Sequence, residues 1–366
     1  MGVSAILFLS FTLVSYVFLI LLFLAAGQES MPARNLIEYP VSVIVAARNA
    51  KAGLEKLLMT LKDQHYSEFE VVVVDDRSTD ETSSMLEELK RDYSWLKVVR
   101  IEKTPENADP KKFALTMGIK KAKHDILLFT DSDCFPGSSG WISGMSNSFD
   151  SETRIVIGFS NYETRHGLLN YFIRFETLWT GIQYMASAVM GNPYMGVGRN
   201  LAYRRSFFAK KKGFRSFANV TGGDDDLFVN KNATSSNTKV ALGKEVLTLS
   251  QPKIRVKEFL DQKLRHLSVG KRYQLKDKLL LGFFNISFLG TLVITLVLIA
   301  KSSVLYWLAS FLLVRWLLMM VIIGRWSKIL GSPINVIGVP ILDILYLFYY
   351  IFTGTRALFI KKVKWT

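Results

Sequence analysis

The sequence predicts an α/β domain with a mostly parallel, Rossmann-like sheet, flanked by transmembrane helices on its N-terminal and C-terminal sides. Between about residues 41 and 278, short runs rich in Val, Ile and Leu alternate with polar, helix-prone stretches. This alternation is typical of parallel strands joined by crossover helices. Outside this region the chain is strongly apolar, so that hydrophobic residues reach 49% although 21% of residues are charged. The segregated composition indicates one chain that faces two solvents.

The first apolar segment, residues 5–26, carries no charge and has about the 20 residues that a helix needs to cross a bilayer. We interpret residues 1–27 as an N-terminal transmembrane anchor. A cleaved signal peptide is the alternative, since Ala25, Ala26 and Gly27 are small. The apolar core of a signal peptide, however, is shorter, about 7–15 residues, and a basic residue precedes it. The first basic residue here, Arg34, comes after the segment, so the positive-inside rule places the next domain in the cytoplasm.

Residues 38–278 form the predicted α/β domain. We expect buried strands at residues 41–45, 70–74, 98–101 and 126–129, and helices at about residues 52–64, 80–91 and 110–121. In sheets of this kind a ligand binds outside the carboxyl ends of the strands. The residues that follow the strands are therefore the first candidates for a functional site.

Residues 279–366 form a C-terminal membrane region with two or three hydrophobic segments, at about residues 279–300, 304–323 and 334–352. The first two predict a helical hairpin around Lys301. The third contains Pro340 and Asp343, so we expect it not to be a simple crossing. Arg315 and Asp343 are costly in hydrocarbon and can pair with each other or line a polar path; we favour snorkelling or a contact with a lipid phosphate.

The composition narrows the choice of partners. The net charge of +15 fits the anionic headgroups of membrane lipids, and no basic, aromatic-interleaved motif predicts a nucleic-acid partner. Cys134 is the only cysteine, so an intramolecular disulfide is excluded. The four histidines are scattered without zinc-ligand spacing.

Acidic residues follow two of the predicted strands. Asp75 and Asp76 come directly after one strand, where carboxylates can accept hydrogen bonds from a base or ribose. Asp131 and Asp133 follow another strand and are separated by one residue. Such a pair can hold Mg²⁺ or Mn²⁺, which prefer oxygen ligands and bridge to phosphates. Lys111, which opens the helix between the two acidic pairs, can reach those phosphates, although solvated helix charges are an equally good interpretation.

A third acidic cluster is Gly222-Gly223-Asp224-Asp225-Asp226. Three successive carboxylates repel one another, which suits a site where one of them takes up a proton. The glycines allow the backbone to approach a ligand closely. We assign a general base for an acceptor hydroxyl to this cluster.

Two further stretches contain candidate residues. Residues 170–205 include aromatic side chains, among them Trp179, that predict a partly amphipathic helix; it can hold an apolar acceptor, and core packing is an equally good explanation. Residues 262–266 (QKLRH) precede the C-terminal membrane region. Arg265 can neutralise a diphosphate leaving group, and a helix here can lie along the bilayer surface. A simple topology signal is the alternative for these basic residues.

Six strings in this order resemble one family: VSVIVAARN, VVVVDDRSTD, KKFAL, DSDCF, GGDDDLF and QKLRH. Together they are similar to the family 2 glycosyltransferases, the inverting class with a GT-A fold, over about residues 41–267. The flanking segments resemble the membrane-bound branch of this family, which includes ceramide glucosyltransferases and polysaccharide synthases. The resemblance implies a metal-dependent, hexosyltransferase-like membrane enzyme of cell-envelope glycan synthesis. It would move a sugar from a nucleotide-sugar, usually a UDP-sugar, to a lipid or lipid-linked glycan at the cytoplasmic face.

The resemblance also implies roles for individual residues. Donor binding falls to Asp75, Asp76, Lys111, Asp131, Gln262 and Arg265, metal binding to Asp131 and Asp133, and acceptor contact to Trp179, Gly198, Arg199, Asn200 and His266. Asp224 matches the catalytic base, because Leu227 follows it at the family's spacing; Asp225 is the alternative under a shifted alignment.

One departure from the family pattern bears on the product. The last motif usually reads QxxRW, and His266 replaces its Trp. In the processive synthases that Trp belongs to the acceptor site, so the replacement disfavours a long polymer as product. A processive polysaccharide synthase and a catalytically inactive membrane scaffold that keeps the fold are the alternatives.

Overall fold

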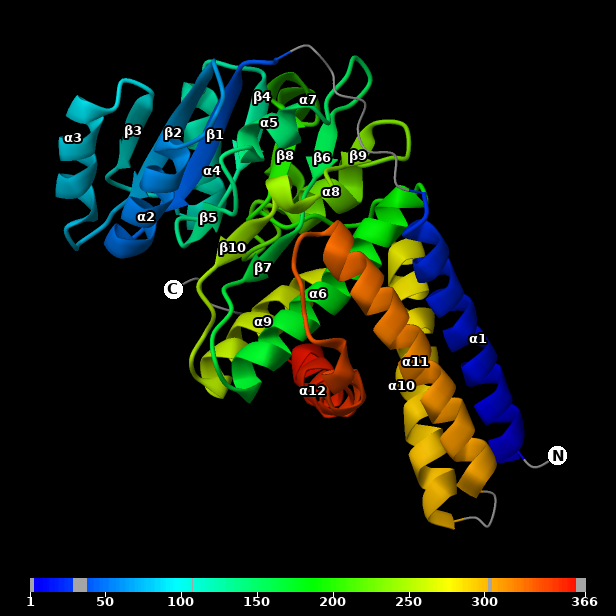
Figure 1. The fold of residues 1–366 in the computed structure, drawn as a ribbon. Helices are drawn as coiled ribbons and strands as arrows, with labels where there is room; N and C mark the ends of the chain where they lie inside the picture. Colours follow the sequence, from blue (N-terminus) through cyan, green and yellow to red (C-terminus); the bar gives the residue numbers. More distant parts are fainter. Residues whose placement is uncertain (1–2, 29–37, 107, 302–304, 360–366) are drawn as a thin grey trace.

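A computed structural model of the chain describes residues 3–28, 38–106, 108–301 and 305–359. An α/β domain lies at one end of a group of long apolar helices (Figure 1). The chain therefore has the expected architecture of an α/β domain with candidate membrane helices near both its ends. The expected turn of the hairpin next to Lys301 falls at residues 302–304, outside the described residues.

The central sheet has seven strands in the order β3-β2-β1-β4-β8-β6-β9. Strands β1 to β4 pair in parallel, whereas β8 runs antiparallel to β4 and β6. Strands β6 and β9 again pair in parallel. The predicted, mostly parallel sheet is thus confirmed, and the reversed strand β8 was not foreseen. The strands are β1 (Val41–Ala47), β2 (Phe69–Asp76), β3 (Leu96–Ile101), β4 (Ile126–Phe129), β6 (Ile155–Ile157), β8 (Leu201–Arg204) and β9 (Thr238–Val240).

The helices α2 (Lys51–Lys62), α3 (Thr82–Asp92) and α4 (Pro110–Lys121) lie close to the predicted ranges. Helix α4 begins sharply because the Asp109 side chain accepts the N–H of Lys112 and Pro110 occupies the first turn. This start fixes the position of Lys111. The remaining short helices of the domain are α5 (Trp141–Ser146), η1 (Arg215–Phe217), α7 (Arg205–Lys210), α8 (Asp226–Asn232) and η2 (Lys244–Val246).

A second, three-stranded sheet has the order β5-β10-β7, with β5 at Cys134–Pro136, β7 at Ser160–Tyr162 and β10 at Thr248–Ser250. Strand β10 pairs antiparallel with β5 and parallel with β7. Because β5 begins directly after Asp133, this small sheet holds the loop that carries the predicted metal ligands.

Within the described ranges, four helices are long and apolar enough to cross a membrane: α1 (Val3–Ala25), α10 (Leu275–Lys301), α11 (Leu305–Ile329) and α12 (Val339–Phe359). In Figure 1, α1, α10 and α11 run side by side, whereas α12 is seen nearly end-on and so lies across them. Helices α6 (Leu168–Val189) and α9 (Val256–Gly270) lie between α12 and the sheets; the short helix η3 (Val336–Gly338) leads into α12.

The two charges predicted inside the membrane region form one ion pair. The guanidinium of Arg315 in α11 donates to both carboxylate oxygens of Asp343 in α12, each at 3.0 Å. Arg315 also donates to the carbonyl of Phe288 in α10, and both charged residues are 1% exposed. Our preference for snorkelling or a lipid-phosphate contact was therefore wrong: a bidentate partner within the protein satisfies the charge.

Candidate active site

The ends of β2 and β4 lie on either side of β1 at one edge of the sheet. Asp75 in β2 is level with Ala47, and Phe129 in β4 is level with Ile44, which places Asp131 near the level of Ala46. Neighbouring strands are about 4.8 Å apart, so the backbones of Asp75 and Asp131 are about 10 Å apart. The first two predicted acidic pairs thus share one edge, with a single strand between them.

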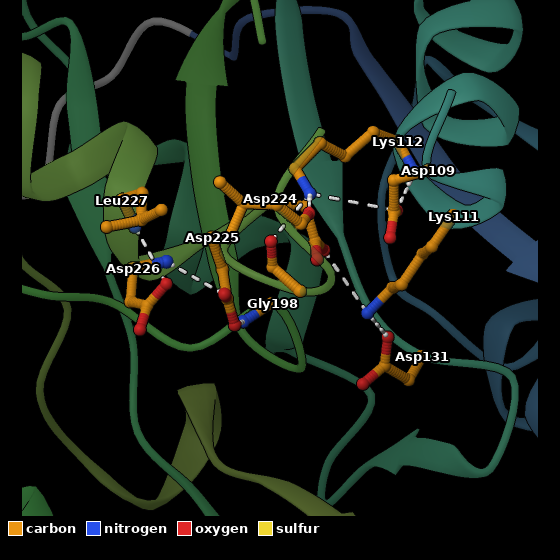
Figure 2. Close-up of polar contacts among 11 residues, drawn as sticks. Asp109, Lys111, Lys112, Asp131, Gly198, Asp224, Asp225, Asp226 and Leu227 are labelled. Carbon is orange, nitrogen blue, oxygen red and sulfur yellow. Dashed lines mark hydrogen bonds and ion pairs between the residues drawn. The ribbon is translucent and has the colours of Figure 1, made fainter. Parts of the chain in front are cut away.

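Lys111 joins the second acidic pair to the third cluster. Its ammonium lies 2.9 Å from a carboxylate oxygen of Asp131 and 3.2 Å from one of Asp224 (Figure 2). Burial alone would lower the pKa of Lys111, but the charges of Asp131, Asp224 and Asp225 outweigh it and raise this pKa well above its usual value. Three stretches that are distant in the sequence therefore meet around one permanent positive charge.

The three consecutive aspartates have different surroundings. Asp225 accepts the N–H of Gly198 at 2.6 Å and the N–H of Asp226, which caps α8. Asp226 accepts the N–H of Leu227 and the hydroxyl of Tyr273. Asp224 differs from both: its described polar partner is Lys111.

The surroundings also shift the pKa values of two of these aspartates. Burial, followed by the charge of Asp224, raises the pKa of Asp225, and burial with the charge of Asp225 raises that of Asp226 well above its usual range. Asp226 is thus the member most strongly driven to hold a proton. Asp224 is the member of the cluster that contacts the Lys111 ammonium.

Cations surround Asp131. Burial would raise its pKa, but the charges of Lys111, Arg199 and Arg265 outweigh burial and lower it. Arg199 donates to Ser250 at 2.9 Å and stacks over the Tyr162 ring. The structure therefore brings the predicted residues Arg199 and Arg265 within electrostatic range of the predicted metal ligand.

Helix α9 carries Arg265 and also Gln262, whose side-chain oxygen accepts from the Tyr162 hydroxyl at 3.4 Å. His266 follows on the same helix with exposed surface. Desolvation, then the charges of Lys263, Arg265, Arg199 and Lys111, lowers the pKa of His266 well below its usual range. The imidazole is therefore neutral at neutral pH and lies in the same electrostatic environment as the predicted site.

A small cavity is lined by side chains of Lys111, Asp131, Tyr203, Asp224 and Asp225 and by Gly198. The site is held from behind by Lys112, which is 3% exposed and donates to the carbonyls of Val220 and Gly222. This contact fixes the loop before Asp224. Adjacent lysines therefore differ: Lys111 faces the cavity, and Lys112 positions one of its walls.

Asp75 and Asp76 are buried at the end of β2 and have local partners. Asp75 accepts the N–H of Ser78 at 3.1 Å and the hydroxyl of Ser83; Asp76 is paired with Arg77 at 2.8 Å. Neither of them lines the small cavity. They hold the loop after β2 at the same sheet edge as the D-x-D loop, and strand β1 lies between these two loops.

The residues of the D-x-D loop fit a hard divalent cation. Ligand atoms of Asp131, Asp133 and Cys134 lie within 4.8 Å of one another. Burial and the neighbouring carboxylates raise the pKa of the Cys134 thiol well above its usual value, and the thiol contacts Ser250 at 2.9 Å. A neutral thiol is a poor ligand for Mg²⁺ or Mn²⁺, so the fitting donor set is the two carboxylates, with further oxygens supplied by a diphosphate and water.

The structure does not bring two of the predicted acceptor residues into this cluster. The amide of Asn200 is fully buried; it donates to the carbonyls of Phe159 and Val246 and accepts from the indole of Trp141. Trp179, 1% exposed, packs against Phe284 and Phe288 of α10. Both contribute to the packing around the site.

Sequence reasoning missed several residues that shape the site. Tyr273 holds Asp226, Tyr203 lines the cavity, and Gly53 in α2 lies against the D-x-D loop. A Cβ on Gly53 would lie 2.7 Å from the carbonyl oxygen of Ser132. The two tyrosines are indistinguishable from core residues in sequence, and a helical glycine is only a weak signal.

Comparisons with known proteins agree with this arrangement. Residues 42–210 match the model of the Glycosyl transferase family 2. "Probable glycosyltransferase YdaM" of Bacillus subtilis (strain 168) is 27% identical over 231 residues, which are 58% of this chain and 54% of that protein. "Beta-monoglucosyldiacylglycerol synthase" of Nostoc sp. (strain PCC 7120 / SAG 25.82 / UTEX 2576) is 35% identical over 95 residues, 25% of this chain and 20% of the synthase. The chain thus spans about half the length of the first relative and a fifth of the second.

The fold has a solved counterpart along almost the whole chain. The mannosyltransferase PcManGT from Pyrobaculum calidifontis, solved with GDP-Man and Mn²⁺, has a TM-score of 0.65 and 17% sequence identity, covering 98% of this chain and 99% of that one. These findings define a glycosyltransferase with a GT-A fold. Residues 42–210 resemble, more particularly, glycosyltransferase family 2, the family that the ordered motifs predicted. The family match ends before Asp224, so the acid cluster and α9 are assigned on geometry.

Proposed function

We propose that this glycosyltransferase is a membrane-anchored, inverting enzyme that moves a sugar from a nucleotide-sugar, first of all a UDP-sugar, to a lipid or lipid-linked glycan at the cytoplasmic face. The observation that carries the proposal is the contact of Lys111 with both Asp131 and Asp224. It joins the residues proposed for the donor diphosphate to the residue proposed for the acceptor, which is the proximity that a single displacement needs.

In the proposed reaction the acceptor oxygen attacks the anomeric carbon, the bond from that carbon to the diphosphate breaks, and the configuration inverts. Asp224 takes the proton from the acceptor hydroxyl. Lys111, Arg199 and Arg265 offset the negative charge that develops on the departing diphosphate. Mg²⁺ or Mn²⁺, held by Asp131 and Asp133, would supply further charge neutralisation there. Asp75 and Asp76 are proposed for the nucleoside, one strand away.

The acceptor class is supported by the membrane helices and by one relative. Four helices have the length and composition of membrane spans, and the similar synthase from Nostoc is named for a glucosyldiacylglycerol product. We propose that α1, α10 and α11 cross the bilayer while α12 lies across them at the cytoplasmic surface. On this arrangement the site opens near the headgroups, where a lipid acceptor presents its hydroxyl.

The first test of the proposal is the substitution Asp224→Asn in the purified full chain. We expect transfer to fall by about 10²- to 10⁴-fold, the usual contribution of a general base, with UDP binding retained. The control is Asp63→Asn at the exposed end of α2, which should behave like the parent. Turnover is followed by mass spectrometry of lipids incubated with a panel of nucleotide-sugars and Mn²⁺, with and without EDTA.

The same assay separates the alternatives. An inactive scaffold would give neither donor hydrolysis nor transfer with any nucleotide-sugar. A processive synthase would give products with many added sugars. Normal turnover of Asp224→Asn, with loss of turnover in Asp225→Asn, would move the base to Asp225.

A further inference from the structure

A short exposed segment between β10 and α9 combines cations with bulky apolar side chains. Residues 253–258 are all exposed, and they alternate as Lys253, Ile254, Arg255, Val256 and Lys257. Ile254 is 70% exposed and Val256 57%. The segment precedes Phe259, which is 2% exposed and begins the buried face of α9.

This exposure is unusual within the molecule. Among the described residues outside α1 and α10–α12, the large hydrophobic side chains that are exposed are Met59, Leu168, Met190, Ile254, Val256 and Ile337. Two of these six, Ile254 and Val256, are separated by a single residue in one segment. Such apolar surface next to cations marks a contact surface more often than a solvated loop.

Leu168, 61% exposed, lies beside the same segment. Helices α6 and α9 run parallel, because Phe172 contacts Phe259 and Glu176 pairs with Lys263 one turn further along both helices. Continuing this register backwards by one turn places Leu168, the first residue of α6, level with Arg255. Figure 1 shows the first turns of α6 and α9 together at the side away from the central sheet. The contact surface therefore extends over two helix ends.

The surface is continuous with α12. Tyr349 of α12 packs on both Phe172 and Phe259, with ring centroids 5.4 Å and 5.7 Å apart. A neighbouring face of α12 exposes Ile341 and Phe348, each 64%.

We propose that the 253–257 segment, with Leu168, docks on an anionic lipid surface, inserting Ile254 and Val256 among the headgroups. This inference depends on the membrane anchoring in the proposed function. The alternation of cationic and apolar residues is the reason for proposing a lipid surface as the partner. The cations meet lipid phosphates while the apolar side chains enter the boundary of the acyl chains. Glu258, 3.9 Å from Arg255, offsets part of the positive charge, which leaves Lys253 and Lys257 as the main contacts. Docking would hold the first turn of α9, whose later turns carry Gln262 and Arg265.

The test uses Ile254→Cys in the full chain, labelled with an environment-sensitive fluorophore and reconstituted in phosphatidylcholine nanodiscs with or without phosphatidylglycerol. Cys134, the native cysteine, is 0% exposed, so the label reports on position 254. We expect a blue shift and quenching by lipids spin-labelled near the headgroup, stronger with phosphatidylglycerol and lost when Lys253→Gln and Lys257→Gln are added. Met59→Cys on α2, a site that is 58% exposed, is the matched control without lipid quenching.

A second label separates this inference from membrane anchoring itself. Phe283→Cys in α10 is at a site that is 64% exposed and should be quenched by lipids in every nanodisc. If spin-labelled lipids quench the label at position 283, while only an aqueous quencher quenches the label at position 254, the docking surface would be overturned and the anchoring would remain. No lipid quenching at 283 would overturn the anchoring. Concentration-dependent shielding of position 254 in detergent would assign the surface to a second copy of the chain and so overturn the lipid partner.

Discussion

Replacing Lys111 by methionine removes the charge between the two halves of the site while keeping the side chain's length. The ammonium lies 2.9 Å from Asp131 and 3.2 Å from Asp224, and 19% of the Lys111 side chain is exposed. In the proposed function, this cation offsets the charge of the donor diphosphate. We therefore expect Lys111→Met to weaken diphosphate binding and to leave nucleoside binding unchanged.

The size of the effect follows from the burial of the pair. Truncating one partner of a buried, hydrogen-bonded charge pair typically costs about 2–5 kcal/mol. A third of the Asp131 side chain is exposed, 33%, so solvent screening favours the lower end, about 2 kcal/mol. At 1.36 kcal/mol per factor of ten, this corresponds to about a 30-fold higher Kd for UDP.

Calorimetric titration of the parent and the variant with UDP and with uridine measures the effect. Lys120→Met, an exposed lysine on the same helix, is the control and should leave both affinities unchanged. The reasoning is refuted if UDP affinity stays within about twofold of the parent, or if uridine affinity falls as much as UDP affinity, because the second result would indicate a collapsed site.

Two further predictions concern packing around the site and in the membrane region. Gly53→Ala should weaken Mn²⁺-dependent UDP binding, since its Cβ would lie 2.7 Å from the backbone of the D-x-D loop. The control is Gly282→Ala, whose Cβ would meet no neighbouring atom within 4 Å. Equal UDP affinities of the two variants would contradict the expectation. Asp343→Leu should destabilise the protein by about 3–5 kcal/mol because it leaves Arg315 buried and unpaired, whereas the double change with Arg315→Leu should recover much of that stability. Thermal unfolding in detergent measures both, and a double variant no more stable than Asp343→Leu would argue against the charge-burial explanation.

The parts of the fold that the sequence predicted are those with a strong local pattern. Strands β1 and β2 are built on runs of Val and Ile, β2 leads directly into Asp75 and Asp76, and the bounds of both strands differ from the expected ones by a residue or two. Strands β5, β7 and β10 have three residues each. A strand of this length has no measurable periodicity, so its pairing is decided by tertiary contacts that a sequence pattern does not contain.

The same distinction applies to the site. Asp131, Lys111 and Asp224 were predicted because each follows a strand or opens a helix in a recognisable string, and the structure brings them together. The neighbouring Asp225 could not be separated from Asp224 in sequence. What distinguishes them is the N–H of Gly198, which Asp225 accepts, and the ammonium of Lys111, which contacts Asp224; both partners come from other parts of the chain.

One cation near the site, Arg265, lies on α9, and the position of this helix depends on α6 and α12. Glu176 in α6, 5% exposed, receives the ammonium of Lys263 in α9 and the hydroxyl of Tyr349 in α12, the latter at 3.1 Å. A buried charge pair of this kind contributes little net stability but strongly penalises any other arrangement of its partners. Lys263 lies between Gln262 and Arg265 on α9, so the contact that attaches this helix to α12 also sets where Arg265 lies. Lys111 on α4 and Arg199 just before β8 come from the α/β domain, whereas the position of Arg265 depends on how α9 packs against α12.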